Sequence, residues 1–345
     1  MNKFLPIIII ILCCFTSCLQ ELKKNKNEPT PNIPVPSADP NGYNNGNDNA
    51  NVNQLIEGSL PGVFSVGLNK QIYFSKGNLQ YQASTNTWRF AENQYDFVGD
   101  DVFGNVYNNG VKSNNSQVAS YYTGWIDLFG WGTSGWNSGA VAYQPWTKST
   151  NYEDYIIPGF DYKKDGIKAL IGSFAYADWG MYNRISNGGD KTGVWRTLTS
   201  NEWQYLNEGR TNSNKLRGVA TVNNVHGIIF LPDNYQATSV KFTPTETSLT
   251  TNNYSYAQWK TLENAGAVFL PAAGELASIA DGNDWKYYPE NVEYWCSNCY
   301  SEMICANFVG YFTKGDYYST NGKFLIVDGF DANWAKLSVR LVYDK

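Results

Sequence analysis

The chain has 345 residues and a formal net charge of −5, and it contains 25 tyrosines and 12 tryptophans but one histidine, His226. An acidic protein has no electrostatic reason to bind nucleic acid or anionic lipid, so we expect no nucleic-acid partner. No Ser-His-Asp or Cys-His arrangement can form without His226, which lies in the apolar segment Val225–Leu231 and is interpreted as structural. The aromatic-rich composition, with 17% charged residues, favours a mostly β domain with a substantial core.

The first residues predict a secretory signal of the bacterial lipoprotein type. Met1–Lys3 is a short basic start, Phe4–Leu12 is almost entirely apolar, and the small residues Thr16 and Ser17 precede Cys18. The apolar run is shorter than the ~20 residues that span a bilayer. We therefore expect residues 1–17 to be removed and Cys18 to be lipidated, which gives the protein a lipid anchor in the membrane. The alternative is an ordinary cleaved signal with incidental cysteines.

Residues 18–61 predict a flexible tether. Five prolines stand between Pro29 and Pro40, and a polar tract rich in asparagine covers Asn41–Asn53. Such a segment cannot bury enough apolar surface to fold. We expect an outer-membrane lipoprotein of the cell envelope that faces either the periplasm or the exterior, with one domain over residues 62–345.

Two hairpins are predicted from alternating apolar residues and turn residues. The alternation in Leu79–Ala83 resumes in Trp88–Phe90 after a turn at 84–87. Further along the chain, Asn321–Gly322 suits the positive φ angles of a type I′ turn. Both segments favour antiparallel pairing.

Two helices are predicted from capping boxes. Thr199–Glu202 and Ser255–Gln258 both have the pattern in which the first hydroxyl accepts from the third amide beyond it and the Glu or Gln side chain returns the bond. A glycine can end each helix. The expected inward residues are Trp203 and Leu206 before Gly209, and Trp259 and Leu262 before Gly266.

The C-terminus predicts a half-buried strand. Leu337, Val339 and Leu341 alternate with Ser338 and Arg340, so the apolar residues share one face and the polar residues the other.

Four segments, in this order, resemble the formylglycine-generating-enzyme-like branch of the C-type-lectin fold: Trp195–Leu206, Ala267–Gly274, Tyr294–Trp295 and Ser338–Val342. The chain also resembles Bacteroidetes-type envelope lipoproteins that carry this domain, and the resemblance covers about residues 62–345. It implies an α+β, C-type-lectin-like fold with twisted antiparallel sheets, two flanking helices and long loops.

The chain also departs from that family. Formylglycine-generating enzymes use two cysteines that hold copper, close to an Arg-Gly-Gly-Ser segment, and no such segment precedes Cys296, Cys299 and Cys305. The Glu-Pro-Asn and Trp-Asn-Asp calcium motifs of sugar-binding lectins do not occur either. We therefore expect no catalytic residues and no enzyme activity. A thiol or copper oxidase acting through the three cysteines is the alternative.

The three cysteines allow several states. In an oxidising compartment Cys296 could pair with Cys299, or one of the two could pair with Cys305, and each choice leaves a third thiol. Three ordinary thiols or a metal or redox site are the alternatives. Zinc usually takes four ligands, and His226 is poorly placed as the fourth, so no metal site is assigned to them.

Acidic residues are interpreted as solvated. The pairs at Asp100–Asp101 and Glu290–Glu293 are predicted to be loop carboxylates rather than a glycosidase pair. Asp328, Asp331 and Asn333 offer oxygen ligands on a glycine-containing segment, but they are too few for an EF-hand loop. We expect no cofactor, with calcium at this segment as the alternative to a simple acidic turn.

The segment from Trp295 to Trp334 is predicted to form the interaction surface, because in related lectin-fold proteins the strands and loops before the final strand form the binding face. The expected contact residues are Asn298, Tyr300, Tyr311, Tyr317, Tyr318, Asn333 and Trp334. Tyr and Trp supply rigid contact area for sugars or proteins. An equal alternative is a domain rich in Tyr and Asn throughout. The expected function is a lipid-anchored binding protein for a glycan or protein ligand, with a structural envelope or fimbria-associated component as another alternative.

Overall fold

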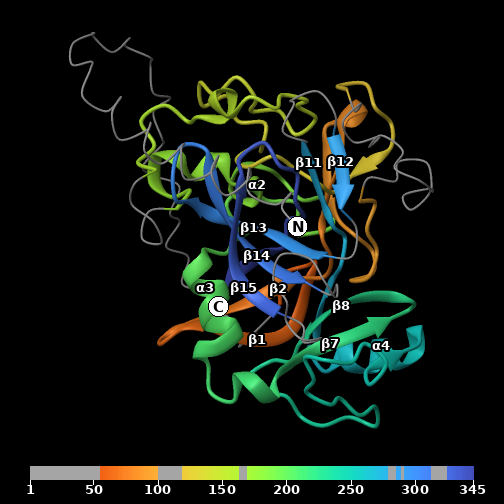
Figure 1. The fold of residues 1–345 in the computed structure, drawn as a ribbon. Coiled ribbons are helices and arrows are strands. Elements are labelled where there is room, and N and C mark those ends of the chain that lie inside the picture. The colour runs from red at the N-terminus through yellow and green to blue at the C-terminus, as the bar shows by residue number, and fades with distance from the viewer. Residues whose placement is uncertain (1–54, 100–118, 163–168, 279–284, 289–290, 312–324) are drawn as a thin grey trace, which may run out of the picture. The chain divides into compact units, whose positions relative to one another are not determined.

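The computed structural model describes residues 55–99, 119–162, 169–278, 285–288, 291–311 and 325–345 (Figure 1). Contacts divide the chain into residues 1–52 and 53–345, and every described residue belongs to the second unit. The expected signal, the lipidation site at Cys18 and nearly all of the tether lie outside the described residues. Within the described part, no helix is both long enough and apolar enough to cross a membrane.

The fold is mixed α+β with mostly antiparallel sheets and few helices, as expected from the sequence. One sheet joins the two ends of the domain in the order β1-β2-β16-β6, with bounds β1 (Ser59–Gly67), β2 (Lys70–Ser75), β16 (Leu341–Asp344) and β6 (Arg196–Thr197). A second has the order β10-β8-β7-β9, with bounds β10 (Val268–Pro271), β8 (Val225–Phe230), β7 (Arg217–Val222) and β9 (Asn253–Tyr254). The short β7–β9 pair is parallel.

Three smaller sheets complete the described strands. They are β4-β3-β5, with bounds β4 (Thr87–Phe90), β3 (Leu79–Gln82) and β5 (Trp125–Ile126), then β11 (Glu275–Ser278) with β12 (Trp285–Tyr288), and finally β13-β14-β15, with bounds β13 (Asn291–Cys299), β14 (Ile304–Tyr311) and β15 (Leu325–Ala332). The last sheet is antiparallel throughout and contains most of the predicted interaction segment. In Figure 1 the strands of this sheet are drawn in blue near the centre of the view, beside α3.

Both capped helices are confirmed. In α3 (Ser200–Gln204) the Thr199 hydroxyl accepts from the Glu202 amide at 3.2 Å, and the Glu202 carboxylate accepts from the Thr199 amide at 2.8 Å. The helix then widens into a π-helical turn, η5 (Tyr205–Gly209). Ser255 and Gln258 cap α4 (Tyr256–Asn264) in the same way. The remaining helical turns are α2 (Trp179–Tyr182), η1 (Ala83–Thr85), η3 (Tyr152–Tyr155), η4 (Gly172–Ala177) and η6 (Ser213–Lys215).

The first predicted hairpin is confirmed, because β3 pairs with β4 from Leu79 opposite Phe90 to Gln82 opposite Thr87. Asn86 takes the left-handed conformation at φ 50°, which asparagine tolerates better than most residues. The second predicted hairpin, at Asn321–Gly322, lies outside the described residues. The first strand begins at Ser59, three residues before the expected start of the domain at 62.

The prediction of a half-buried C-terminal strand is wrong, because both of its faces are buried. Ser338 is 0% exposed and Arg340 is 1% exposed. Leu337 bridges to Phe129 on one side, and Ser338 bridges to Tyr294 on the other, before the chain enters β16. The alternation of polar and apolar residues therefore separates two buried environments rather than core and solvent.

Arg340 is held inside by neutral partners. Its Nη2 donates to Gln94 Oε1 at 2.8 Å, and its Nη1 lies 3.5 Å from Asn78 Oδ1. Burial lowers the pKa of Arg340 to about 10. Tyr294 also donates to Asn78 Oδ1 at 2.9 Å, so β13, the strand on which the predicted interaction segment begins, is fixed to the same polar network.

The β13–β14 pair lies between two hydrophobic clusters, which makes it a rigid base for any site at its ends. Trp295 and Cys299 on β13 face a cluster that also contains Trp131 and Trp179. Tyr294 and the other alternate residues face a second cluster with Phe64, Phe74, Trp203 and Phe308. The rings of Trp203 and Phe308 stack with centroids 4.5 Å apart, which fixes α3 against β14.

Candidate functional site

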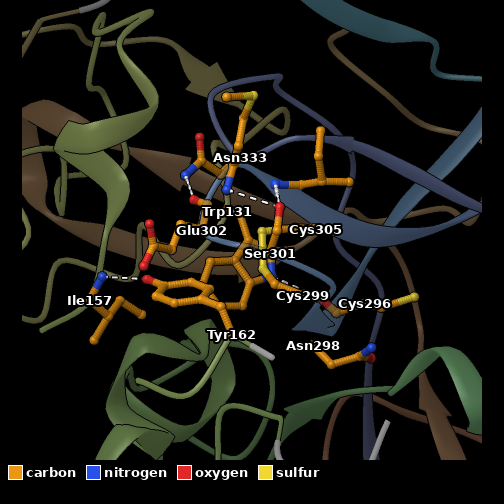
Figure 2. The surroundings of a disulfide bond; sticks show 12 residues. Trp131, Ile157, Tyr162, Cys296, Asn298, Cys299, Ser301, Glu302, Cys305 and Asn333 are labelled. Atoms are coloured by element: carbon orange, nitrogen blue, oxygen red, sulfur yellow. Dashed lines mark hydrogen bonds between the residues drawn. A yellow bond between two sulfur atoms is a disulfide. The ribbon is translucent and has the colours of Figure 1, made fainter. Parts of the chain in front are cut away.

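The end of the β13–β14 pair is closed by a disulfide between Cys299 and Cys305. The two residues are register partners across the strands, after a β-bulge that follows Trp295. Cys299 is 2% exposed and Cys305 is 0% exposed. Of the pairings that the sequence left open, Cys299 with Cys305 is confirmed and Cys296 with Cys299 is wrong. The physical reason is strand alternation, because Cys296 belongs to the opposite hydrophobic cluster, and Figure 2 shows its side chain pointing away from the disulfide.

Aromatic rings cover the disulfide from inside the protein (Figure 2). Trp131 lies against it and donates from Nε1 to the Cys296 carbonyl at 3.0 Å. The Tyr162 ring packs on Trp131 with centroids 6.4 Å apart, and its hydroxyl accepts from the Ile157 amide. Burial raises the pKa of Tyr162 to about 12, so the phenol stays neutral at physiological pH. The hairpin end is therefore anchored in the core.

Beyond the disulfide, the hairpin end exposes apolar side chains. Tyr300 is 39% exposed, Met303 is 38% exposed, and Phe330 on the neighbouring β15 is 67% exposed. The Tyr300 and Phe330 rings meet edge to face with centroids 6.3 Å apart. We call Tyr300, Met303 and Phe330 the tip patch. Of these three, Tyr300 was predicted from the sequence, whereas Met303 and Phe330 were not, since Phe330 stands among residues that were interpreted only as oxygen ligands.

The two expected asparagines are buried and serve the scaffold. Asn298 is 0% exposed; its Oδ1 accepts from the Ser200 amide at 2.9 Å, and its Nδ2 donates to the Ser200 hydroxyl at 3.1 Å, at the start of α3. Asn333 is also 0% exposed, and its Nδ2 donates to the carbonyls of Glu302 at 2.9 Å and Tyr152 at 3.1 Å. These amides fix the hairpin end and are not placed to touch a ligand.

The other expected contact residues are only partly described. Tyr311 is the last residue of β14, and its side chain lies outside the described part. Tyr317 and Tyr318 fall in 312–324, which is also outside it. Trp334 is half-buried. The structure therefore brings Tyr300, Trp334 and the two buried asparagines to one end of the sheet.

A second group of contacting aromatic rings lies on a different part of the chain. The Trp136 and Tyr176 rings have centroids 5.9 Å apart, and Tyr176 and Tyr182 are separated by the same distance. Tyr176 is 53% exposed and Tyr182 is 38% exposed. We call these three residues the loop patch. It was not predicted from the sequence, because Trp136 meets the other two rings only through the positions of η4 and α2.

A cluster of three carboxylates lies near the tip patch, because its Asp331 is next to Phe330 on β15. Glu275 of β11, Glu293 of β13 and Asp331 of β15 bring one oxygen each within 4.8 Å of one another. Glu293 is 2% exposed, whereas Glu275 and Asp331 are half-buried. The prediction that Glu293 is a solvated loop carboxylate is therefore wrong, because it stands on a strand that is buried on both faces. The other acidic residues of that prediction lie outside the described residues.

The carboxylate cluster is electrostatically unbalanced. Burial, and then the neighbouring charge of Asp331, raises the pKa of Glu293 to about 7. Burial and the charge of Glu293 hold the pKa of Glu275 well above its usual range, and burial and Glu275 do the same for Asp331. Among the described residues, no Lys or Arg forms an ion pair with any of the three. Such a cluster takes up protons or a cation.

The oxygen ligands that the sequence grouped with Asp331 are not the ones that the fold brings to it. Residues 325–332 form strand β15 instead of a loop. The Asn333 side chain donates to backbone carbonyls, and the side chain of Asp328 lies outside the described part. Glu275 and Glu293 approach Asp331 instead, from strands that precede it in the chain.

No family model, no curated protein and no solved structure matches this chain. The resemblance to the formylglycine-generating-enzyme-like branch stays a prediction, and function is argued from the geometry above.

Proposed function

We propose that this protein is a non-catalytic binding protein of the bacterial cell envelope, which recognises a glycan or protein ligand through the tip patch. The single observation that carries this proposal is the exposed Tyr300–Phe330 ring pair on a hairpin end that a disulfide closes. Exposed aromatic pairs offer a large contact area at a low cost in side-chain entropy, and they stack on sugar rings as well as on protein side chains.

The tip patch is held in place before any ligand arrives. The Tyr300 and Ser301 amides both donate to the Ile304 carbonyl, at 2.9 and 3.1 Å, which closes the turn. The Asn333 amide donates to the Met303 carbonyl at 2.8 Å, and its side chain holds the Glu302 carbonyl. A preorganised surface loses little conformational entropy on binding, which favours recognition by a small area.

The envelope location and the lipid anchor rest on the sequence. The basic and apolar start, the small residues before Cys18 and the Pro/Asn-rich stretch to residue 61 support a lipidated protein on a tether. The finer fold proposal is a C-type-lectin-like domain of the formylglycine-generating-enzyme-like branch. It is supported by the mostly antiparallel sheets and by the capped helix α3, which lies inside one of the segments that carry the resemblance.

The oxidase alternative has no support in the geometry of the cysteines. Cys299 and Cys305 are joined to each other, and each is at most 2% exposed. Cys296 is fully buried on the other side of the strand. A cysteine that binds copper or reacts with a substrate must be reachable, and none of the three is more than 2% exposed.

The test is a screen of the purified protein against glycan and host-protein arrays, followed by affinity measurements with two matched double variants. Tyr300→Ala with Phe330→Ala removes the tip patch rings, whereas Tyr176→Ala with Tyr182→Ala removes two exposed rings of the loop patch. We expect the first pair to weaken binding by about 30-fold or more and the second to leave it nearly unchanged.

Thermal unfolding of both double variants controls for folding, because all four side chains are exposed and their loss should shift Tm little. If the tip variant binds as well as the wild type, the site assignment fails, and a loss confined to the loop variant would move the site to the loop patch. A ligand found only in envelope extract, as part of a stable assembly, would favour the structural envelope component.

A further inference from the structure

The register of β13, β14 and β15 places three polar side chains on one face of the sheet. Glu293 of β13 pairs with the residue two positions after Asn307 on β14, and Asp331 of β15 pairs with the residue two positions before it. Alternate residues of a strand share a face, so Asn307 lies on the middle strand, on the diagonal between Glu293 and Asp331.

Glu275 completes the cluster from another sheet. Its neighbour Leu276 exchanges backbone hydrogen bonds with Lys336, at 3.0 and 2.8 Å, and this isolated bridge fixes the start of β11. The carboxyl group of Glu275 meets both Glu293 and Asp331 at hydrogen-bonding range. Three acidic side chains from three separate strands thus converge on one point.

Asn307 gives the second, independent sign of a ligand. It is 1% exposed, and its Nδ2 donates to Asp331 Oδ2 at 3.2 Å, which places the amide against the cluster. Its Oδ1 has no hydrogen-bond partner, and neither has Oε2 of the buried Glu293. A buried oxygen without a partner costs about 1–3 kcal/mol, so each of these two atoms would be stabilised by one.

The strand opposite Asn307 is adapted to its amide group. Gly329 is its register partner, and a Cβ at that position would lie 2.2 Å from Asn307 Oδ1. The absent side chain therefore provides the room that the amide oxygen occupies. A larger residue at 329 would displace the one neutral oxygen in the cluster.

We propose that Glu275, Glu293 and Asp331, with the amide oxygen of Asn307, form a binding site for a divalent cation of the calcium type. All four groups offer hard oxygen ligands, which calcium prefers, and the half-buried Glu275 and Asp331 leave an approach from solvent. Zinc favours nitrogen and sulfur ligands, and the cluster contains neither histidine nor cysteine. Magnesium usually keeps several waters and is seldom held by a protein cage alone.

The cation balances negative charge with which no Lys or Arg of the described residues forms an ion pair. Two of the three negative charges are neutralised by the ion, and the amides of Asn291 and Asn307 donate to the cluster, to Glu293 Oε1 at 3.1 Å and to Asp331 Oδ2 at 3.2 Å. The ion would tie β11, β13 and β15 together, one residue from Phe330 of the tip patch. The site stands on its own contacts, whether or not the tip patch binds a ligand.

The experiment uses the purified protein after treatment with a chelator, titrated with CaCl2 in a calorimeter and followed in parallel by thermal unfolding. We expect one equivalent of calcium to bind and Tm to rise by about 5 °C at a concentration near 100 times Kd. Magnesium at the same concentration should give a smaller shift. Terbium provides a local readout, because Trp295 is the register partner of Asn307 and should sensitise its luminescence.

Variants separate this site from calcium bound elsewhere. Glu293→Gln and Asp331→Asn should abolish the calcium-dependent rise in Tm and the terbium signal, whereas Glu302→Gln, an exposed carboxylate on the same hairpin, should keep both. In chelator, Glu293→Gln should be at least as stable as the wild type, because it removes one of three like charges, so its loss of response is not a loss of folding.

Two results would overturn the proposal. One is a wild-type protein with no heat, no Tm shift and no terbium signal up to about 10 mM calcium, well above the dissociation constants of extracellular calcium modules. The other is an unchanged response in Glu293→Gln, which would place the ion at a different site.

Discussion

Two regions of this protein bury glutamates in opposite ways. At the start of α3, Glu202 accepts from Arg196 through two bonds of 2.8 Å and lies 2.7 Å from Lys70. Burial alone would raise the pKa of Glu202, but the hydrogen bonds and charge of Arg196 lower it below its ordinary value. In the carboxylate cluster, Glu293 has no cationic partner among the described residues, and its pKa rises to about 7.

Burial does not by itself determine what a carboxylate does. Around Glu202 the charges are balanced within the protein, since Arg196 also pairs with Asp344 at 2.7 Å, and the network joins α3 to β2, β6 and β16 of one sheet. Around Glu293 no Lys or Arg of the described residues forms an ion pair, and protons or a cation can supply the balance. The first arrangement is structural, and the second can respond to its surroundings.

The largest expected loss of stability from a single substitution comes from removing the charge that balances the α3 network. Glu202→Gln should destabilise the folded state by about 2 kcal/mol, because it leaves the mostly buried Arg196 with only the more exposed Asp344 as a partner and weakens the capping box. Urea unfolding at neutral pH measures the change in the free energy of unfolding.

The matched control is the same substitution in the cluster. Glu293→Gln, measured in chelator, should leave stability unchanged or raised, since it removes like-charge repulsion. Equal losses of stability in both variants would mean that a counterion balances the charge of the carboxylate cluster even in chelator.

How much of this could be predicted from the sequence depends on how local each feature is. The two capped helices and the 79–90 hairpin were predictable, because their deciding hydrogen bonds join residues within a few positions. The π-helical turn after α3 was not, since it follows from packing rather than from a capping pattern. Burial of polar residues was not predictable where their partners are distant in the sequence. Arg340 is an example, because it is buried against Gln94 and Asn78 from another part of the fold.

The candidate site was predictable in its region but not in its chemistry. Tyr300 was named from the family resemblance, whereas its ring partner Phe330 is brought alongside only by the β14–β15 register. The disulfide partner of Cys299 depends on a bulge that no short pattern reveals. The carboxylate cluster combines Glu275, Glu293 and Asp331 across two sheets, and no short sequence pattern groups them.

Asp127 is a third kind of buried carboxylate, because backbone amides rather than charged side chains hold it. It is 0% exposed and accepts from the amides of Val98 at 2.7 Å and Gly99 at 2.9 Å. Burial outweighs these bonds and raises the pKa of Asp127 from 3.8 to about 7. Because the folded-state value is raised, the folded protein binds more protons than the unfolded chain between these two values.

Asp127 should therefore make the protein less stable as the pH rises from 4 to 7. Its contribution is fully present below the unfolded pKa and falls by about 1 kcal/mol per pH unit until the pH passes the folded pKa. Asp127→Asn should flatten that part of the profile, as measured by urea unfolding at several pH values in chelator. Parallel profiles for the variant and the wild type would show that another group dominates this range.

The smallest expected effect comes from a charge pair that is neither buried nor clustered. Arg217 Nη1 lies 2.7 Å from Glu246 Oε1, yet the Glu246 side chain is 45% exposed, so water and salt compete with the pair. Glu246→Gln should change the free energy of unfolding by about 0.5 kcal/mol or less, and raising the salt concentration should remove even that. The distance in this pair equals the 2.7 Å between Lys70 and Glu202, so a large loss at Glu246 would mean that short distances, rather than desolvation and shared partners, decide which carboxylates hold this fold together.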